Sequence, residues 1–227
     1  IDCCVVVSEC TKRDLIKHFK IDEKKIKVVY LGADARYNPA TKESVDAVRR
    51  KFGITDPYFL SVGSVPRKNI DGIIKGFAGC KYKNDYQLVL NCYMDVEKYA
   101  GLCSSLGVND RVVFINSVND EDLVALFSGC HCFVFPSLYE GFGLPILEAM
   151  KCGAPVITSN ISSCPEVAGE AALLVDPNNV NEISAAINQV CDSDTLRKSL
   201  IGKGFERSKM FSWDKFARGM KDIYALA

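Results

Sequence analysis

Short runs of β-branched and other apolar residues alternate with amphipathic stretches along nearly the whole chain. This alternation is typical of parallel β-strands joined by crossover helices. Polar residues of the kind that cap helices precede the amphipathic stretches. The predicted strands cover residues 3–7, 27–30, 58–62, 87–90, 111–115, 132–135, 156–158 and 172–175. The sequence therefore predicts an α/β fold, a Rossmann-like, doubly wound parallel sheet with helices on both faces.

The pattern changes at two places, which divide the chain into three parts. Turn-forming residues at 32–39 follow a strand, a helix and a second strand, so we expect residues 1–35 to be the end of a preceding domain plus a linker. Residues 36–210 then form the main domain, and 211–227 a closing helix. After residue 177 the strands stop, and extra C-terminal helices are predicted at 180–191, 195–210 and 213–227. Because the chain begins in a strand with no initiator methionine, we expect it to be cut from a longer protein.

Composition and charge narrow the class of ligand. Of the 227 residues, 48% are hydrophobic and 25% are charged, as in ordinary globular proteins that fold in water. The 28 lysines and arginines balance 28 acidic residues, so no net field favours nucleic acid, and an anionic ligand needs local positive charge. No apolar run approaches the ~18 residues of a membrane span, and no secretory signal is present, which predicts a cytoplasmic protein.

Eleven cysteines lie mostly inside apolar runs such as 3–7 and 131–134. That setting is typical of reduced thiols that fill a core. The chain has no Cys-x-x-Cys pair and its two histidines are far apart in sequence, so no structural zinc site is predicted.

The first candidate site is the loop after the predicted strand at 58–62. It contains Gly63, followed by the adjacent cations Arg67 and Lys68 and then a predicted helix. A helix N-terminus offers free N–H groups and a partial positive charge, to which these side chains add two full charges. The loop therefore suits a diphosphate. The alternative is that Arg67 and Lys68 form a solvated basic pair in a turn.

The second candidate site follows the predicted strand at 132–135. Gly141 and Gly143 allow close approach of a ligand to the backbone, and a helix begins near Pro145. Glu140 in the loop and Glu148 on the helix can face the same cleft, where carboxylates suit sugar and ribose hydroxyls. The alternative is a glycine turn with exposed glutamates. Use of the two glutamates as in a glycosidase is a further alternative, but it leaves the cations of the first loop without a role.

Residues 139–150 resemble the Glu-x7-Glu signature of retaining glycosyltransferases of family 4, with Glu140 and Glu148 as the two glutamates. Further segments resemble that family in the same order along the chain: 7–15, 30–34, 62–69, 153–157, 165–167 and 211–213. The resemblance implies a GT-B enzyme of two Rossmann-like domains. This chain would be its C-terminal, donor-binding half, and residues 1–35 would be the tail end of the missing N-terminal acceptor domain.

The resemblance also implies roles for individual residues. Arg67 and Lys68 would hold the diphosphate, Glu148 the ribose hydroxyls and Glu140 a hydroxyl of the transferred sugar, which makes Glu140, Lys68 and Arg67 the expected catalytic residues. The expected contacts to the nucleotide sugar further include Gly63, Gly141, Phe142, Gly143, the amide of Leu144, and Val118 beside the base. One departure is Ser64, which stands where many members of the family carry an arginine.

The implied reaction is transfer of a hexose from a nucleotide-diphosphate sugar, of the GDP-mannose or UDP-glucose type, to a glycan or lipid-linked acceptor with retention of configuration. It needs no metal or other cofactor. The residues of the two loops resemble those of bacterial surface-polysaccharide enzymes, including enzymes of lipopolysaccharide biosynthesis. The Asp-x-Asp motifs at 120–122 and 192–194 are interpreted as helix caps rather than metal ligands. A non-catalytic nucleotide-sugar-binding module and an epimerase or phosphorylase on the same fold are the alternatives. The full-length protein is expected to be cytoplasmic, either free in the cytoplasm or peripherally bound at the cytosolic face of the membrane.

Overall fold

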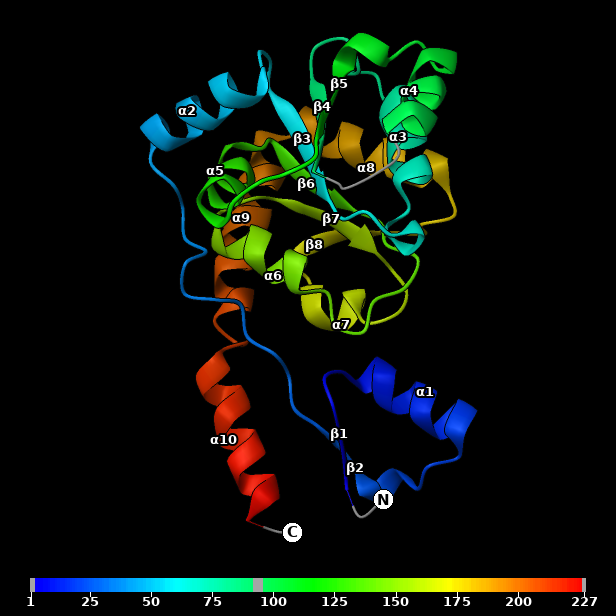
Figure 1. Ribbon diagram of the computed structural model, residues 1–227, viewed down its shortest axis with the longest axis vertical. Helices are drawn as coiled ribbons and strands as arrows, with labels where there is room; N and C mark the ends of the chain where they lie inside the picture. The colour runs from blue at the N-terminus through cyan, green and yellow to red at the C-terminus, as the bar shows by residue number, and fades with distance from the viewer. Residues whose placement is uncertain (1–2, 92–95, 226–227) are drawn as a thin grey trace.

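A computed structural model describes residues 3–91 and 96–225, and its centre is a six-stranded parallel sheet (Figure 1). The strand order is β5-β4-β3-β6-β7-β8, and every pairing is parallel. These strands are β3 (Tyr58–Val62), β4 (Gln87–Asn91), β5 (Val112–Ile115), β6 (Cys132–Phe135), β7 (Val156–Ser159) and β8 (Ala172–Val175). The predicted α/β class and the predicted strands are confirmed.

The sheet is buried on both faces because its two central strands, β3 and β6, are apolar at every position except Ser61. In β3, Tyr58 and Leu60 belong to the hydrophobic core on one face and Phe59 to the core on the other. In β6, Phe133 and Cys132 divide in the same way. Side chains alternate between the two faces of a strand, so an unbroken apolar run serves two cores at once.

Helices cover both faces, as predicted. The first core is closed by α2 (Lys42–Phe52), α5 (Asp120–Gly129), α6 (Leu144–Lys151) and α7 (Cys164–Ala168). The second is closed by α3 (Ile70–Gly79), α4 (Val96–Ser105), α8 (Val180–Asp192) and α9 (Asp194–Ser208). Short 3-10 turns, which the hydrophobic pattern did not indicate, occupy η1 (Glu23–Lys25), η2 (Pro66–Lys68) and η3 (Asn109–Arg111). Arg111 therefore lies in a turn rather than in the strand predicted at 111–115.

The first part of the chain forms a second, small sheet at one end of the molecule, beside α7 (Figure 1). It pairs β1 (Cys4–Val6) with β2 (Ile26–Val28), and α1 (Glu9–Phe19) connects them. The last helix, α10 (Trp213–Tyr224), packs against the segment after β2, since a side chain on Gly32 would collide with the backbone nitrogen of Trp213. The division at residues 35 and 210 stays a prediction, and positions 1–2 and 226–227 of its outer parts lie outside the described residues.

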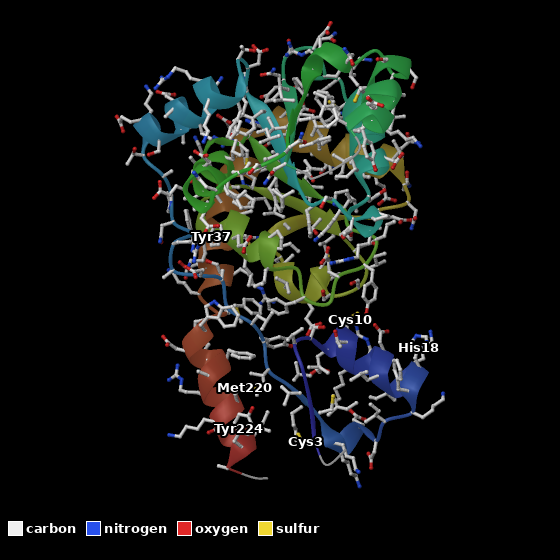
Figure 2. All side chains as sticks on the ribbon, viewed as in Figure 1. Cys3, Cys10, His18, Tyr37, Met220 and Tyr224 are labelled. Atoms are coloured by element: carbon white, nitrogen blue, oxygen red, sulfur yellow. The ribbon has the colours of Figure 1, made fainter. Side chains whose placement is uncertain are left out.

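Most described cysteines fill the interior, as predicted. Those that are buried are Cys10, Cys80, Cys103, Cys130, Cys132, Cys152 and Cys164. Cys3, which directly precedes β1, is exposed, and the prediction was wrong there (Figure 2). Cys92 lies outside the described residues.

Candidate functional site

The two candidate loops meet at the centre of the sheet. β3 and β6 are direct neighbours, with Phe59 opposite Cys132 and Leu60 opposite Phe133. The chain leaves β3 toward β4 on one side, whereas β6 is followed by β7 on the other, so the strand order reverses between β3 and β6. In open α/β sheets such a switch point opens a crevice at the carboxyl ends of the strands. Both loops lie at these carboxyl ends.

The loop after β3 is shaped by Gly63 and Asn69, which both have positive φ angles, of 117° and 60°. A side chain on Gly63 would place its Cβ 2.8 Å from Cγ of Lys68, so the glycine makes room for the lysine stem. The Asn69 amide donates hydrogen bonds to the carbonyl oxygens of Pro136 at 3.1 Å and Pro177 at 2.7 Å. Asn69 therefore ties this loop to the one after β6.

Glu140 binds both cations of the first loop. Its carboxylate lies 2.9 Å from Nη1 of Arg67 and 2.7 Å from Nζ of Lys68, and it accepts a hydrogen bond of 2.6 Å from the Ser137 hydroxyl. Lys68 also lies over the ring of Phe135, 4.4 Å from its centroid. The side chains of Glu140 and Lys68 are 7% and 12% exposed, so each buried charge is compensated by the other.

The interpretation of Arg67 and Lys68 as a solvated pair is wrong for Lys68, which is enclosed. Arg67 is 48% exposed and stays open to solvent. The cluster carries two positive charges against one negative charge. The net charge beside Glu140 is therefore positive, as an anionic ligand requires.

The loop after β6 is fixed through the carbonyl oxygens of residues 139–142, each of which accepts a hydrogen bond from a side chain. Tyr139 O accepts from Arg67 at 3.2 Å, Glu140 O from Ser162 at 2.7 Å and Ser163 at 2.9 Å, Gly141 O from Ser8 at 2.6 Å and Thr11 at 3.3 Å, and Phe142 O from Ser163 at 2.8 Å. Within the described part of the chain, no group accepts from the N–H groups of residues 141–144. These N–H groups stand at the start of α6, where Gly143 has a φ of 101°.

Glu148 lies one turn into α6 and is partly buried, so it is not the exposed helix glutamate of the alternative interpretation. Burial raises the pKa of its carboxyl to about 7, while Tyr37 and Lys68 act in the opposite direction. Lys68 thus lies close enough to affect Glu148 while it binds Glu140. Tyr37 reaches this region from the linker, where it is buried against the first core (Figure 2).

Val118 stands apart from this cluster. It follows β5, which is the edge strand of the sheet, and packs against the first core. The described contacts bring together Arg67, Lys68 and Glu140 directly, with Gly63 against Lys68. Glu148 joins them through its proximity to Lys68.

Several residues of the site were missed by the sequence analysis. Ser137, Ser162 and Ser163 all donate hydroxyl hydrogen bonds to Glu140 or its loop. Their signal is a set of serines directly after two neighbouring strands, β6 and β7, at the carboxyl edge of the sheet. Ser162 also has a φ of 62°, an uncommon conformation for a residue other than glycine, and no sequence pattern indicated it.

The acidic residues at 120–122 lie in the first turn of α5 and Asp194 in that of α9, as predicted, but Asp192 is the last residue of α8. Other residues supply the caps. Asn119 caps α5 by accepting from the N–H of Asp122, and Ser193 caps α9 by accepting from the N–H of Leu196. Across residues 3–91 and 96–225 there is no cluster of three or more side chains that suits a metal ion.

In the same residues no helix is long and apolar enough to cross a bilayer.

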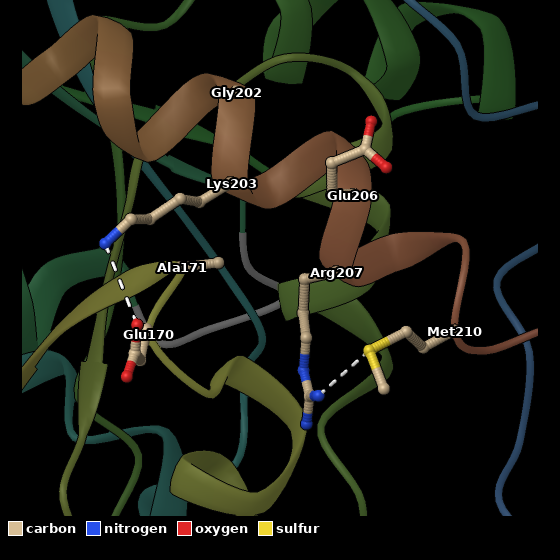
Figure 3. Close-up of a pocket in the computed structure, with 7 residues that line it drawn as sticks. All are labelled: Glu170, Ala171, Gly202, Lys203, Glu206, Arg207 and Met210. Carbon is tan, nitrogen blue, oxygen red and sulfur yellow. Dashed lines mark hydrogen bonds and ion pairs between the residues drawn. The ribbon is translucent and has the colours of Figure 1, made fainter.

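A shallow pocket lies apart from the two loops, between α9 and the turn before β8 (Figure 3). It is lined by Glu170, Ala171, Gly202, Lys203, Glu206, Arg207 and Met210. Arg207 already donates to the carbonyl oxygen of Val167 at 2.9 Å and contacts the Met210 sulfur at 3.2 Å. None of the predicted site residues lines this pocket.

A doubly wound parallel sheet with a charged cluster at its switch point defines a Rossmann-like domain. The family model "Glycosyl transferases group 1" matches residues 44–207, and the chain belongs to this family. O-antigen chain mannosyltransferase B of Escherichia coli is 34% identical over 228 residues, which cover 98% of this chain and 60% of the relative. The MMP alpha-(1->4)-mannosyltransferase of Mycolicibacterium hassiacum is 30% identical over 98% of this chain and 54% of its own length.

The fold agrees with solved glycosyltransferase structures. Anabaena Alr3699/HepE, solved in complex with UDP and glucose, superposes with a TM-score of 0.88 at 20% identity over 100% of this chain and 64% of that one. The predicted GT-B resemblance is therefore confirmed at the level of family and fold. The chain spans less than two thirds of the length of each of these proteins.

Proposed function

We propose that this chain is the donor-binding part of a retaining, metal-independent glycosyltransferase that moves a hexose from a nucleotide-diphosphate sugar to a glycan or lipid-linked acceptor. The observation that carries the proposal is the cluster of Arg67, Lys68 and Glu140 at the switch point of the sheet. It places cations, a carboxylate and unpaired N–H groups around one crevice. The acceptor site and the remaining contacts would lie in an N-terminal domain.

The chemistry of each residue of the site indicates which part of the nucleotide sugar it would contact. Arg67, Lys68 and the N–H group of Leu144 suit the diphosphate, because hydrogen-bond donors and positive charge stabilise phosphate oxygens. The backbone of residues 141–143 would contact the transferred sugar. When the bond between the sugar and the diphosphate breaks, negative charge grows on the leaving phosphate. Fixed donors lower the barrier most when they are in place before that charge develops.

The two glutamates suit hydroxyl groups. In the described part of the chain Tyr37 is the hydrogen-bond partner of Glu148, whose carboxyl can also accept hydrogen bonds from ribose hydroxyls, whereas Glu140 belongs to the loop that would hold the transferred sugar. The base would lie beside Val118, and the sugar would contact Gly141 and Phe142.

Mannose is the sugar favoured by the relatives, because three that are at least 30% identical are named mannosyltransferases. GDP-mannose is therefore the first donor to test and UDP-glucose the second. The name of the O-antigen enzyme supports a role in bacterial surface-polysaccharide synthesis, and we place that role in the cytoplasm or at the cytosolic face of the membrane as part of the proposal.

The test is calorimetric titration of the chain with GDP, UDP and their sugar conjugates, with and without EDTA. We expect binding that EDTA does not change. Glu148→Ala should weaken the binding of the nucleotide, and Glu140→Ala should spare the nucleotide but remove the added affinity of the sugar. Glu170→Ala is the matched control, because Glu170 is 95% exposed. No binding of any nucleotide diphosphate by the folded chain refutes the proposal, and equal effects of the two variants refute the division of roles.

A further inference from the structure

The start of α1 is bonded to two loops of the six-stranded sheet, although α1 belongs to the small sheet. Glu166 on α7 accepts hydrogen bonds from the N–H groups of Glu9 at 2.7 Å and Cys10 at 3.2 Å. The carbonyl oxygen of Glu166 in turn accepts from Arg207 at 2.5 Å. A carboxylate at a helix N-terminus binds free N–H groups and a partial positive charge. Glu166 therefore anchors α1 to the main domain.

Ser8 extends this contact to the loop after β6. It is fully buried, and its hydroxyl oxygen caps α1 by accepting from the N–H of Thr11 at 3.0 Å. The same hydroxyl donates to the carbonyl oxygen of Gly141 at 2.6 Å, and the Thr11 hydroxyl lies 3.3 Å from that oxygen. One side chain thus both begins a helix and holds the middle of the loop.

Two further contacts fix the residues on either side of Gly141. The Tyr139 hydroxyl donates to Asp14 of α1 at 2.5 Å. The ring of Phe142 lies 6.1 Å from that of Tyr30 and 5.8 Å from that of Phe211, measured between centroids. Glu140, which lies between Tyr139 and Gly141 in the sequence, contacts Arg67 and Lys68 instead. Positions 139, 141 and 142 therefore each contact residues outside the main sheet, in addition to the bonds from Arg67 and Ser163 to the carbonyl oxygens of Tyr139 and Phe142. Position 140 is held by the site and by Ser162 and Ser163.

We propose that Ser8, Thr11 and Asp14, here named the α1 latch, set the position of loop 139–143. Ser8 is then a positioning residue: it acts on the donor sugar through the loop, not by contact with the sugar. The consequence for sugar binding rests on the proposed function. The mechanical part of the proposal, that the latch holds the loop, does not.

Hydrogen exchange tests the mechanical part. Ser8→Ala removes a hydrogen bond to the carbonyl oxygen of Gly141, so we expect faster exchange of the bonded amides on either side of it: that of Glu140, which donates to Ser162 at 2.7 Å, and that of Ile146, which donates to the carbonyl oxygen of Gly143 at 3.0 Å. The expected change is about five-fold, as for loss of one hydrogen bond. The matched control is Ser193→Ala, which removes the cap of α9 but touches neither loop. Unchanged exchange in Ser8→Ala, or an equal change in Ser193→Ala, overturns the proposal.

Tyr139→Phe keeps the test decisive if Ser8→Ala does not fold. Tyr139 is 46% exposed, so this variant removes only the hydroxyl bonded to Asp14. Faster exchange of the same amides is expected, and unchanged exchange counts against the latch.

Calorimetry tests the consequence for sugar binding. In Ser8→Ala, the ratio of the Kd for GDP to the Kd for GDP-mannose should fall about five-fold while the Kd for GDP stays unchanged. A loss of affinity shared equally by both ligands overturns the positioning role. If wild-type protein binds neither ligand nor the UDP pair, the proposed function fails, and the exchange experiment still decides whether the latch exists.

Discussion

Replacement of Glu148 by glutamine isolates the effect of one buried carboxyl. Burial raises the pKa of Glu148 from its ordinary value of 4.5 to about 7, so the folded state disfavours the ionised form. A shift of this size corresponds to about 3 kcal/mol, since one pKa unit is worth about 1.4 kcal/mol. Glu148→Gln keeps the shape of the side chain and removes the ionisation.

The sign of the pH dependence follows from proton binding. Between pH 4.5 and 7 the folded state holds the proton of Glu148 and the unfolded state releases it, so the free energy of unfolding falls as the pH rises through this window. Below pH 4.5 both states are protonated and the penalty vanishes. We therefore expect Glu148→Gln to match the wild type at pH 4.5 and to be more stable at pH 8, by at most about 3 kcal/mol.

Urea unfolding at a series of pH values measures this difference. The contributions of other titrating groups cancel when the free energy of unfolding of the variant is subtracted from that of the wild type at each pH. Glu170→Gln, at a 95% exposed position, makes the same chemical change without burial and should show no such trend. A stability difference that does not vary between pH 4.5 and 8 would refute the reasoning.

Three further changes probe the loops. Glu140→Gln should destabilise the fold by about 3 kcal/mol, because it leaves the enclosed Lys68 without its partner, and denaturant unfolding measures the loss. Gly63→Ala should cost about 1–3 kcal/mol from its positive φ and should weaken nucleotide binding by displacing Lys68; unchanged affinity in titration would contradict this. Ser163→Ala should cost about 1–3 kcal/mol in a thermal or urea melt, because it leaves the carbonyl oxygen of Phe142 without its buried donor and that of Glu140 with Ser162 alone.

The strands of the fold could be predicted because burial on both faces leaves a continuous apolar run, as in β3 and β6. The 3-10 turns could not, because η2 and η3 are too short to show a period. Arg111 looked like strand for that reason. The caps of α5 and α9 were one residue from the acidic groups chosen, since several polar residues in a row can cap and only the backbone decides which one does.

The charges of the site were visible in the sequence, but their pairing was not. Arg67 and Lys68 stand next to each other in the chain, and their common partner Glu140 lies on a loop more than seventy positions away. Only the adjacency of β3 and β6 brings them together. The serines that hold the loop were missed because an isolated hydroxyl carries no periodic signal, and Ser8 belongs to a part of the chain that the sequence assigned elsewhere.

The reversal of strand order between β3 and β6 also has a consequence for how the molecule folds. Pairing these strands closes a loop of about seventy residues, which costs roughly 4 kcal/mol of chain entropy before any contact is gained. Long-range parallel pairing of this kind is slow. Because Arg67, Lys68 and Glu140 meet only across that pair, the cluster can exist only in molecules that have completed the slow step. A ligand held by all three would bind the native state alone, and its concentration would shift the folding equilibrium by mass action.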